Sequence, residues 1–199
     1  MKHIFKILTL CGFTAFLLQG CGQKKSFLSK SPDDFSCTQI EEETICTPKE
    51  WRLVKQSRFL FYDAIGANDT SDYFVVLKYN KLTTGLSIKK YLEETYKTLM
   101  VDTNEKFTGY TSKKLIYNSK VSFYSEYYTT TTKPLITFSM VFENDESIFE
   151  LALKSKIENA AINKELFGKI LFEFKHKNEP IFLRSDKIQK AERIDLSKI

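Results

Sequence analysis

The sequence predicts an α+β fold in which an antiparallel sheet is covered by helices. Apolar residues alternate with period two over 107–153, and the connections there are too short for parallel crossovers. Two other segments, 88–100 and 164–174, have helical periodicity. Strands and helices are thus segregated along the chain. A length of 199 residues fits one domain with tails.

The first twenty residues predict a signal peptide. Two lysines precede an apolar run over 7–18, which is shorter than the ~20 residues needed to span a bilayer. The following Leu18-Gln19-Gly20-Cys21 resembles the bacterial lipobox, Leu-x-Gly-Cys. This resemblance implies that Cys21 is acylated and becomes the first mature residue, anchoring the protein to a membrane. The alternative is a plain secretory signal followed by an incidental cysteine.

The residue after Cys21 bears on localisation. Gly22 stands where Asp would be expected for retention in the inner membrane, so the resemblance favours the outer membrane of a bacterial envelope, facing the periplasm. Residues 21–36 are polar and predict a flexible stalk. The net charge of +5 falls to +3 without residues 1–20, and its even distribution gives no indication of nucleic-acid binding.

Cys37 and Cys46 are the two cysteines left after the leader and Cys21 are assigned. A lone pair of thiols outside the cytoplasm favours a structural disulfide, with free thiols or a catalytic dithiol as alternatives. Ile40 and Ile45 flank the acidic run 41–43, so we expect two short strands joined by a solvated turn.

The elements of the domain, expected over 37–176, follow from local patterns. Residues 58–65 and 73–79 are predicted strands, and Ser87 is a predicted N-cap for the first helix. Asn163 is a predicted cap for the second helix. Residues 177–199 form a charged C-terminal tail, expected to be a short surface helix or a loose segment.

This layout resembles the PsbP-like fold, which includes photosystem II extrinsic proteins and many bacterial lipoproteins. The resemblance covers about 40–175 and consists of the order of elements together with Pro48-Lys49-Glu50-Trp51. It implies a helix–sheet–helix sandwich with no catalytic residues to transfer. It also implies an accessory or assembly role, by analogy of fold alone.

Enzyme chemistry is not indicated by any motif. The sequence has no Gly-x-Ser-x-Gly, His-Glu-x-x-His, phosphate loop or dinucleotide fingerprint. Only His176 remains after removal of the leader, so we expect a structural or surface histidine, no metal site and no cofactor. The acidic pairs 93–94 and 145–146 are expected on a solvated helix face and in a turn.

The best indication of a binding surface is a pair of tyrosines on one face of a predicted strand. Tyr124 and Tyr128 alternate with Phe123 and Tyr127, so they share one strand face with Glu126. Tyrosine is enriched at protein interfaces, which makes Tyr124, Glu126 and Tyr128 a candidate partner-binding face. The alternative is that a helix covers this face as well.

These observations predict a lipid-anchored, non-enzymatic envelope protein that binds a protein partner, as an assembly factor or an immunity protein would. The alternative is a carrier of an apolar small molecule or lipid, with a pocket between helix and sheet lined by some of the 17 phenylalanines.

Overall fold

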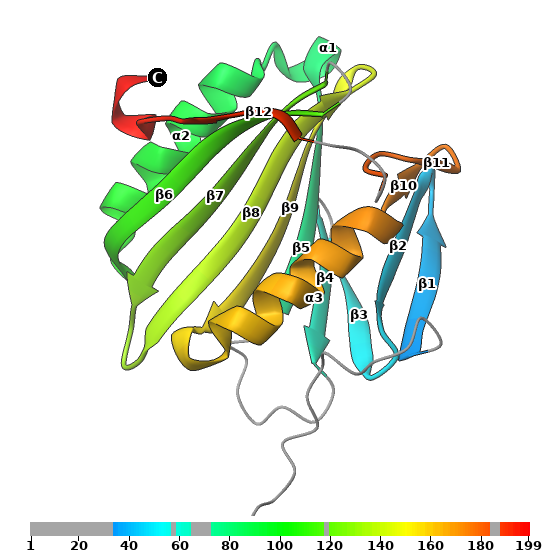
Figure 1. The fold of residues 1–199 in the computed structure, drawn as a ribbon, viewed down its shortest axis with the longest axis horizontal. Helices are drawn as coiled ribbons and strands as arrows, with labels where there is room; N and C mark the ends of the chain where they lie inside the picture. Colours follow the sequence, from blue (N-terminus) through cyan, green and yellow to red (C-terminus); the bar gives the residue numbers. More distant parts are fainter. Residues whose placement is uncertain (1–33, 57–58, 65–72, 118–119, 184–187) are drawn as a thin grey trace, which may run out of the picture.

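The computed structural model describes residues 34–56, 59–64, 73–117, 120–183 and 188–199 (Figure 1). The predicted signal peptide, Cys21 and most of the predicted stalk lie outside these ranges. The strands form an eight-stranded and a four-stranded sheet, and every pairing is antiparallel. The predicted α+β class with an antiparallel sheet is confirmed.

The large sheet has the strand order β12-β6-β7-β8-β9-β5-β4-β3. Its strands are β3 (Trp51–Gln56), β4 (Phe59–Ala64), β5 (Tyr73–Asn80), β6 (Lys106–Tyr117), β7 (Lys120–Thr130), β8 (Pro134–Asn144), β9 (Ser147–Lys156) and β12 (Ile188–Arg193). The consecutive pairing of β6, β7, β8 and β9 is the expected meander. Sequence patterns did not predict β3, which follows the turn at Pro48 and forms one edge of the sheet.

Within the predicted charged tail, residues 188–193 form a strand, and a three-residue 3-10 helix follows over Leu196–Lys198. β12 pairs with β6 and forms the other edge of the large sheet, although all six of its side chains are exposed. Beyond it, Leu196 is buried, and its backbone N–H donates to Tyr110 Oη over 3.0 Å. Backbone pairing and one buried leucine therefore hold this charged segment.

The small sheet has the order β1-β2-β10-β11, with β1 (Phe35–Ile40), β2 (Glu43–Pro48), β10 (Lys175–His176) and β11 (Glu179–Pro180). Cys37 and Cys46 lie directly opposite each other in β1 and β2 and form the expected disulfide, with Cα atoms 4.0 Å apart. The acidic run is only partly solvated, because Glu43 belongs to β2 and its residue surface is 4% exposed.

Two apolar clusters lie on opposite faces of the large sheet because side chains alternate along its strands. Helix α2 (Ile88–Val101) contributes Tyr91 and Leu92 to one cluster. Helix α3 (Ala160–Glu173) and the small sheet contribute to the other, and Figure 1 shows them side by side. A short helix, α1 (Lys81–Thr84), precedes α2 and ends at Gly85, which has a left-handed conformation with φ of 61°. None of the helices in the described part of the chain combines the length and apolar character needed to cross a membrane.

The helix starts show one correct and one wrong prediction. Ser87 caps α2 as expected, since its Oγ accepts a hydrogen bond from the N–H of Lys90. The prediction for Asn163 is wrong: α3 already begins at Ala160, and Asn163 lies buried within it. Its Nδ2 donates to Ser155 Oγ over 2.6 Å, so this amide serves a tertiary contact with β9.

Replacing both Cys37 and Cys46 with Ser should lower the free energy of unfolding by roughly 2.5–3 kcal/mol, because the disulfide closes a ten-residue loop in the unfolded chain. Urea denaturation of the wild type and the double variant measures this difference. A reducing agent should destabilise the wild type and leave the double variant unaffected. Equal stability of the oxidised wild type and the variant would contradict the expectation.

Candidate functional site

The predicted face on β7 is a hydrogen-bonded group built around Glu126. Tyr124 Oη donates to Glu126 Oε1 over 2.8 Å, and Tyr128 Oη donates to Oε2 over 2.9 Å. Lys164, in the first half of α3, donates to Oε1 over 2.7 Å, and its Nζ lies 5.7 Å from the centre of the Tyr124 ring. The structure thus brings together all three predicted residues and adds a lysine.

The group is partly covered by α3. Tyr124 and Tyr128 pack against the apolar cluster that contains α3, as the alternative interpretation anticipated. The cover is incomplete, since Tyr124, Glu126 and Tyr128 are all half-buried. The Lys164 side chain is more than half exposed, at 57%. The group is therefore partly accessible from the surface.

Charge distribution in this group follows from its hydrogen bonds. Burial acts to raise the pKa of Glu126, but the hydrogen bonds from Lys164, Tyr124 and Tyr128 outweigh it and hold the pKa below its ordinary value. Burial and the neighbouring carboxylate raise the pKa of both tyrosines. At neutral pH the group is therefore an ionised carboxylate held by neutral phenols and a lysine.

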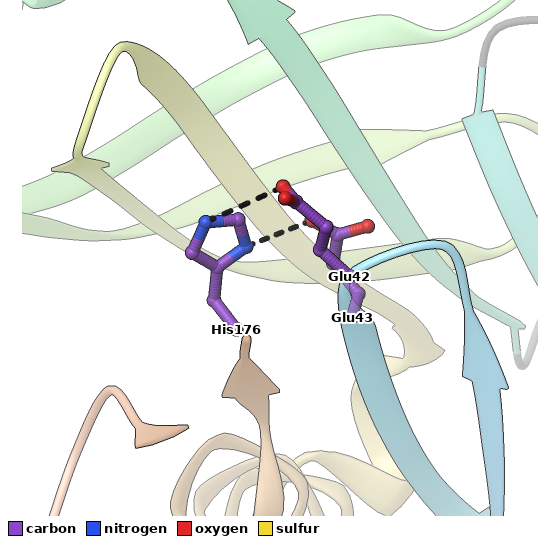
Figure 2. A group of neighbouring side chains, drawn as sticks. All are labelled: Glu42, Glu43 and His176. Atoms are coloured by element: carbon purple, nitrogen blue, oxygen red, sulfur yellow. Dashed lines mark hydrogen bonds and ion pairs between the residues drawn. The ribbon is translucent and has the colours of Figure 1, made fainter. Parts of the chain in front are cut away.

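A second polar group joins the small sheet to the large one (Figure 2). His176 Nδ1 lies 2.9 Å from Glu43 Oε1, and its Nε2 lies 3.8 Å from Glu42 Oε2. Lys78 of β5 donates to the same oxygen of Glu43 over 2.8 Å. The imidazole ring also packs against Phe149 of β9, with ring centres 5.4 Å apart. His176 is therefore buried at the contact between the two sheets and is not a surface histidine.

Strand pairing explains this arrangement, which sequence analysis missed. β10 pairs with β2 so that His176 lies directly opposite Glu43, although 133 residues separate them. A two-residue strand carries no periodic signal, so no local pattern points to the contact.

A third polar group is buried between α2 and the large sheet. Glu150 of β9 is 7% exposed and accepts hydrogen bonds from Tyr91 of α2 and, over 2.6 Å, from Ser139 of β8. Burial raises the pKa of Glu150 above its ordinary value, against the opposing effect of the hydrogen bonds from Ser139 and Tyr91. Its role is structural, since it lies inside the core.

A pocket lies at one end of the large sheet. It is lined mainly by Tyr117, Val121, Phe142, Phe182 and neighbouring residues. It therefore lies between strand ends and the segment after β11.

Comparison with known proteins identifies the fold. Cyanobacterial PsbP (CyanoP) from Synechocystis sp. PCC 6803 has a similar structure, with a TM-score of 0.52 and 10% sequence identity over 74% of this chain and 95% of that chain. The chain has a PsbP-like fold.

Two other solved structures are less similar to this chain. A Pseudomonas aeruginosa protein of unknown function has a TM-score of 0.44 at 10% identity, covering 68% of this chain and 92% of that chain. A Bacteroides thetaiotaomicron VPI-5482 protein has a TM-score of 0.42 at 9% identity, covering 69% of this chain and 46% of that chain. No protein-family model and no curated protein matches the chain in sequence.

An identity of 10% with CyanoP transfers the PsbP-like fold and no residue role.

Glu150→Gln should make stability less dependent on pH. The folded-state pKa of Glu150 is raised, so its contribution to stability is complete below about pH 4.5, its ordinary pKa, and is lost as the pH rises through the folded-state pKa. The unfolding free energy of the variant, relative to the wild type, should therefore rise from about pH 5 to about pH 8. Urea denaturation across this range measures it.

The exposed Glu158→Gln serves as the control and should retain the pH dependence of the wild type. Parallel pH profiles for Glu150→Gln and the wild type would show that the carboxyl of Glu150 has no raised pKa.

Proposed function

We propose that this protein is a lipid-anchored, non-enzymatic module of the bacterial envelope that binds a protein partner close to the membrane. The lipobox-like Leu18–Cys21 supports the anchor. The observation that carries the binding role is the half-buried group of Tyr124, Glu126 and Tyr128 on β7. It belongs to a PsbP-like domain, whose fold is compatible with an accessory role.

The chemistry of this group favours recognition over catalysis. A general acid or base that works near neutral pH needs a pKa near 7. The pKa of Glu126 is instead held low, and both of its oxygens accept hydrogen bonds. Tyrosine rings that already point their hydroxyls at a carboxylate lose little freedom when a partner binds, which favours affinity.

We also propose that the domain is a helix–sheet–helix sandwich, as the resemblance implies. Support comes from the two apolar clusters on opposite faces of the large sheet, one containing α2 and the other α3. α3 shares its face with the small sheet, so the layer on that side has two parts (Figure 1).

Cys21→Ser should abolish lipid attachment. The variant is expected to keep residues 1–20, to lack the mass of the acyl chains and to leave the outer-membrane fraction, since the thiol that accepts the lipid is missing. Intact mass spectrometry and density-gradient fractionation measure both changes. Cys11→Ser is the matched control, because Cys11 lies in the leader and should be removed with it. A variant at Cys21 with wild-type mass and location would overturn the anchor.

Tyr128→Ala should weaken partner binding at least tenfold, because we expect Tyr128 to be a hot spot of the interface, and truncating a hot-spot residue costs about 2 kcal/mol or more. Chemical crosslinking in the native envelope, followed by quantitative mass spectrometry, measures the yield of the stoichiometric complex. Tyr96→Ala is the control: Tyr96 is also half-buried, but it packs with Phe107 and Tyr110 on the α2 side. Equal losses with both variants, or none with either, would exclude the β7 face.

A further inference from the structure

Three chain segments bring potential metal ligands close to the imidazole of His176. One ligand atom from each of Glu42, Glu43 and His176 lies within 4.8 Å of the others. Glu42 lies in the turn between β1 and β2, Asp145 lies in the turn between β8 and β9, and His176 ends β10. The backbone N–H of Lys177 donates to the carbonyl of Glu42 over 2.7 Å, which fixes the two segments of the small sheet relative to each other. The cluster lies beyond the C-terminal end of α3, whereas Lys164 reaches Glu126 from the N-terminal half of that helix.

The imidazole of His176 is held in one orientation. Glu43 is 4% exposed, and its Oε1 receives both Lys78 Nζ at 2.8 Å and His176 Nδ1 at 2.9 Å. An ionised carboxylate is an acceptor only, so Nδ1 carries the hydrogen and donates it. In a neutral imidazole the lone pair then belongs to Nε2, which is the atom that faces Glu42 and Asp145. A carboxylate behind a ligating histidine is the usual support of such ligands in zinc proteins.

Two carboxylate oxygens lie close enough to Nε2 to share a small divalent ion with it. Nε2 lies 3.4 Å from Asp145 Oδ2 and 3.8 Å from Glu42 Oε2. Two ligands that each lie 2.0–2.1 Å from a tetrahedral zinc ion are about 3.4 Å apart. We propose that Glu42, Asp145 and His176 bind a divalent transition-metal ion, with zinc as the best match, and that Glu43 positions the ring of His176.

An ion can reach the site from solvent, and the lysine that now pairs with Asp145 can move away. The side chains of Glu42 and Asp145 are 50% and 53% exposed, so an ion reaches Nε2 from solvent past these carboxylates. Lys177 Nζ pairs with Asp145 Oδ2 at 2.9 Å, but it is also 53% exposed and its long side chain can turn into water when the metal binds. With three protein ligands, a fourth position remains for water or for a group of a partner.

Isothermal titration calorimetry with zinc chloride tests the site on the full chain, stripped of metal with a chelator and carrying no polyhistidine tag. One zinc ion per chain is expected. Glu42→Gln and Asp145→Asn should each weaken binding at least tenfold, since each removes one of three ligands. Glu41→Gln and Glu146→Gln are matched controls, because they remove the same charge from the same two turns and should stay within twofold of the wild type.

Cobalt provides a second measurement. Substitution with Co²⁺ should give the visible absorption of a tetrahedral ion, and this signal should disappear in Glu42→Gln and Asp145→Asn while the controls retain it. Glu43→Gln should weaken binding 10–100-fold through the orientation of His176. Absence of stoichiometric zinc binding, or equal weakening by the variants and their controls, would overturn the proposal.

Discussion

Burial of both faces of the central strands is the constraint on which the rest of the structure depends. On β8 and β9, one face carries Phe138, Met140 and Leu151, and the other carries Val141 and Ile148. A sheet that is apolar on both sides needs a cover on both sides. α2 supplies one cover, while α3 and the small sheet supply the other.

The same constraint explains the hydrogen bonds of Glu150. A carboxyl on a strand that is buried on both faces must find its hydrogen bonds inside the protein, and Ser139 and Tyr91 provide them.

Sequence patterns predict the elements whose apolar residues follow a helical or a two-residue period. α2 shows a clear apolar stripe and a serine cap, and the meander shows period two, so both are recognisable locally. β12 exposes all six side chains, and β10 and β11 have two residues each, so none of them has an apolar pattern. These strands form because a neighbouring strand edge offers backbone hydrogen bonds. Such pairing depends on the tertiary structure and leaves no local pattern in the sequence. The wrong cap at Asn163 has the same origin, because its amide is engaged by Ser155 of β9.

The group around Glu126 and the cluster around His176 also differ in how far the sequence predicts them. Alternation along β7 is enough to place Tyr124, Glu126 and Tyr128 on one face, so this group was predictable from the sequence. The contact between Glu126 and Lys164 was not predictable in this way, because Lys164 belongs to α3 and alternation along β7 says nothing about that helix. The cluster around His176 needs three segments to meet, and the pairing of β2 with β10 is visible only in the folded chain. Local patterns therefore identify a face, whereas long-range pairing assembles a set of ligands.

The small sheet shows why the His176 cluster matters to the fold as well as to binding. β10 and β11 have only two residues each, so the small sheet is little more than the hairpin of β1 and β2, and an isolated hairpin is marginally stable. The disulfide joins β1 to β2 within this sheet, and Ile45 of β2 enters the main core. β10 is held through His176, which packs edge-to-face against Phe149, and β2 is held through the pair formed by Glu43 and Lys78. Asp145 extends this contact to the turn of the large sheet, 3.4 Å from Nε2. An ion between these carboxylates and the imidazole would therefore bridge the two sheets, so ion binding and docking of the small sheet would stabilise each other.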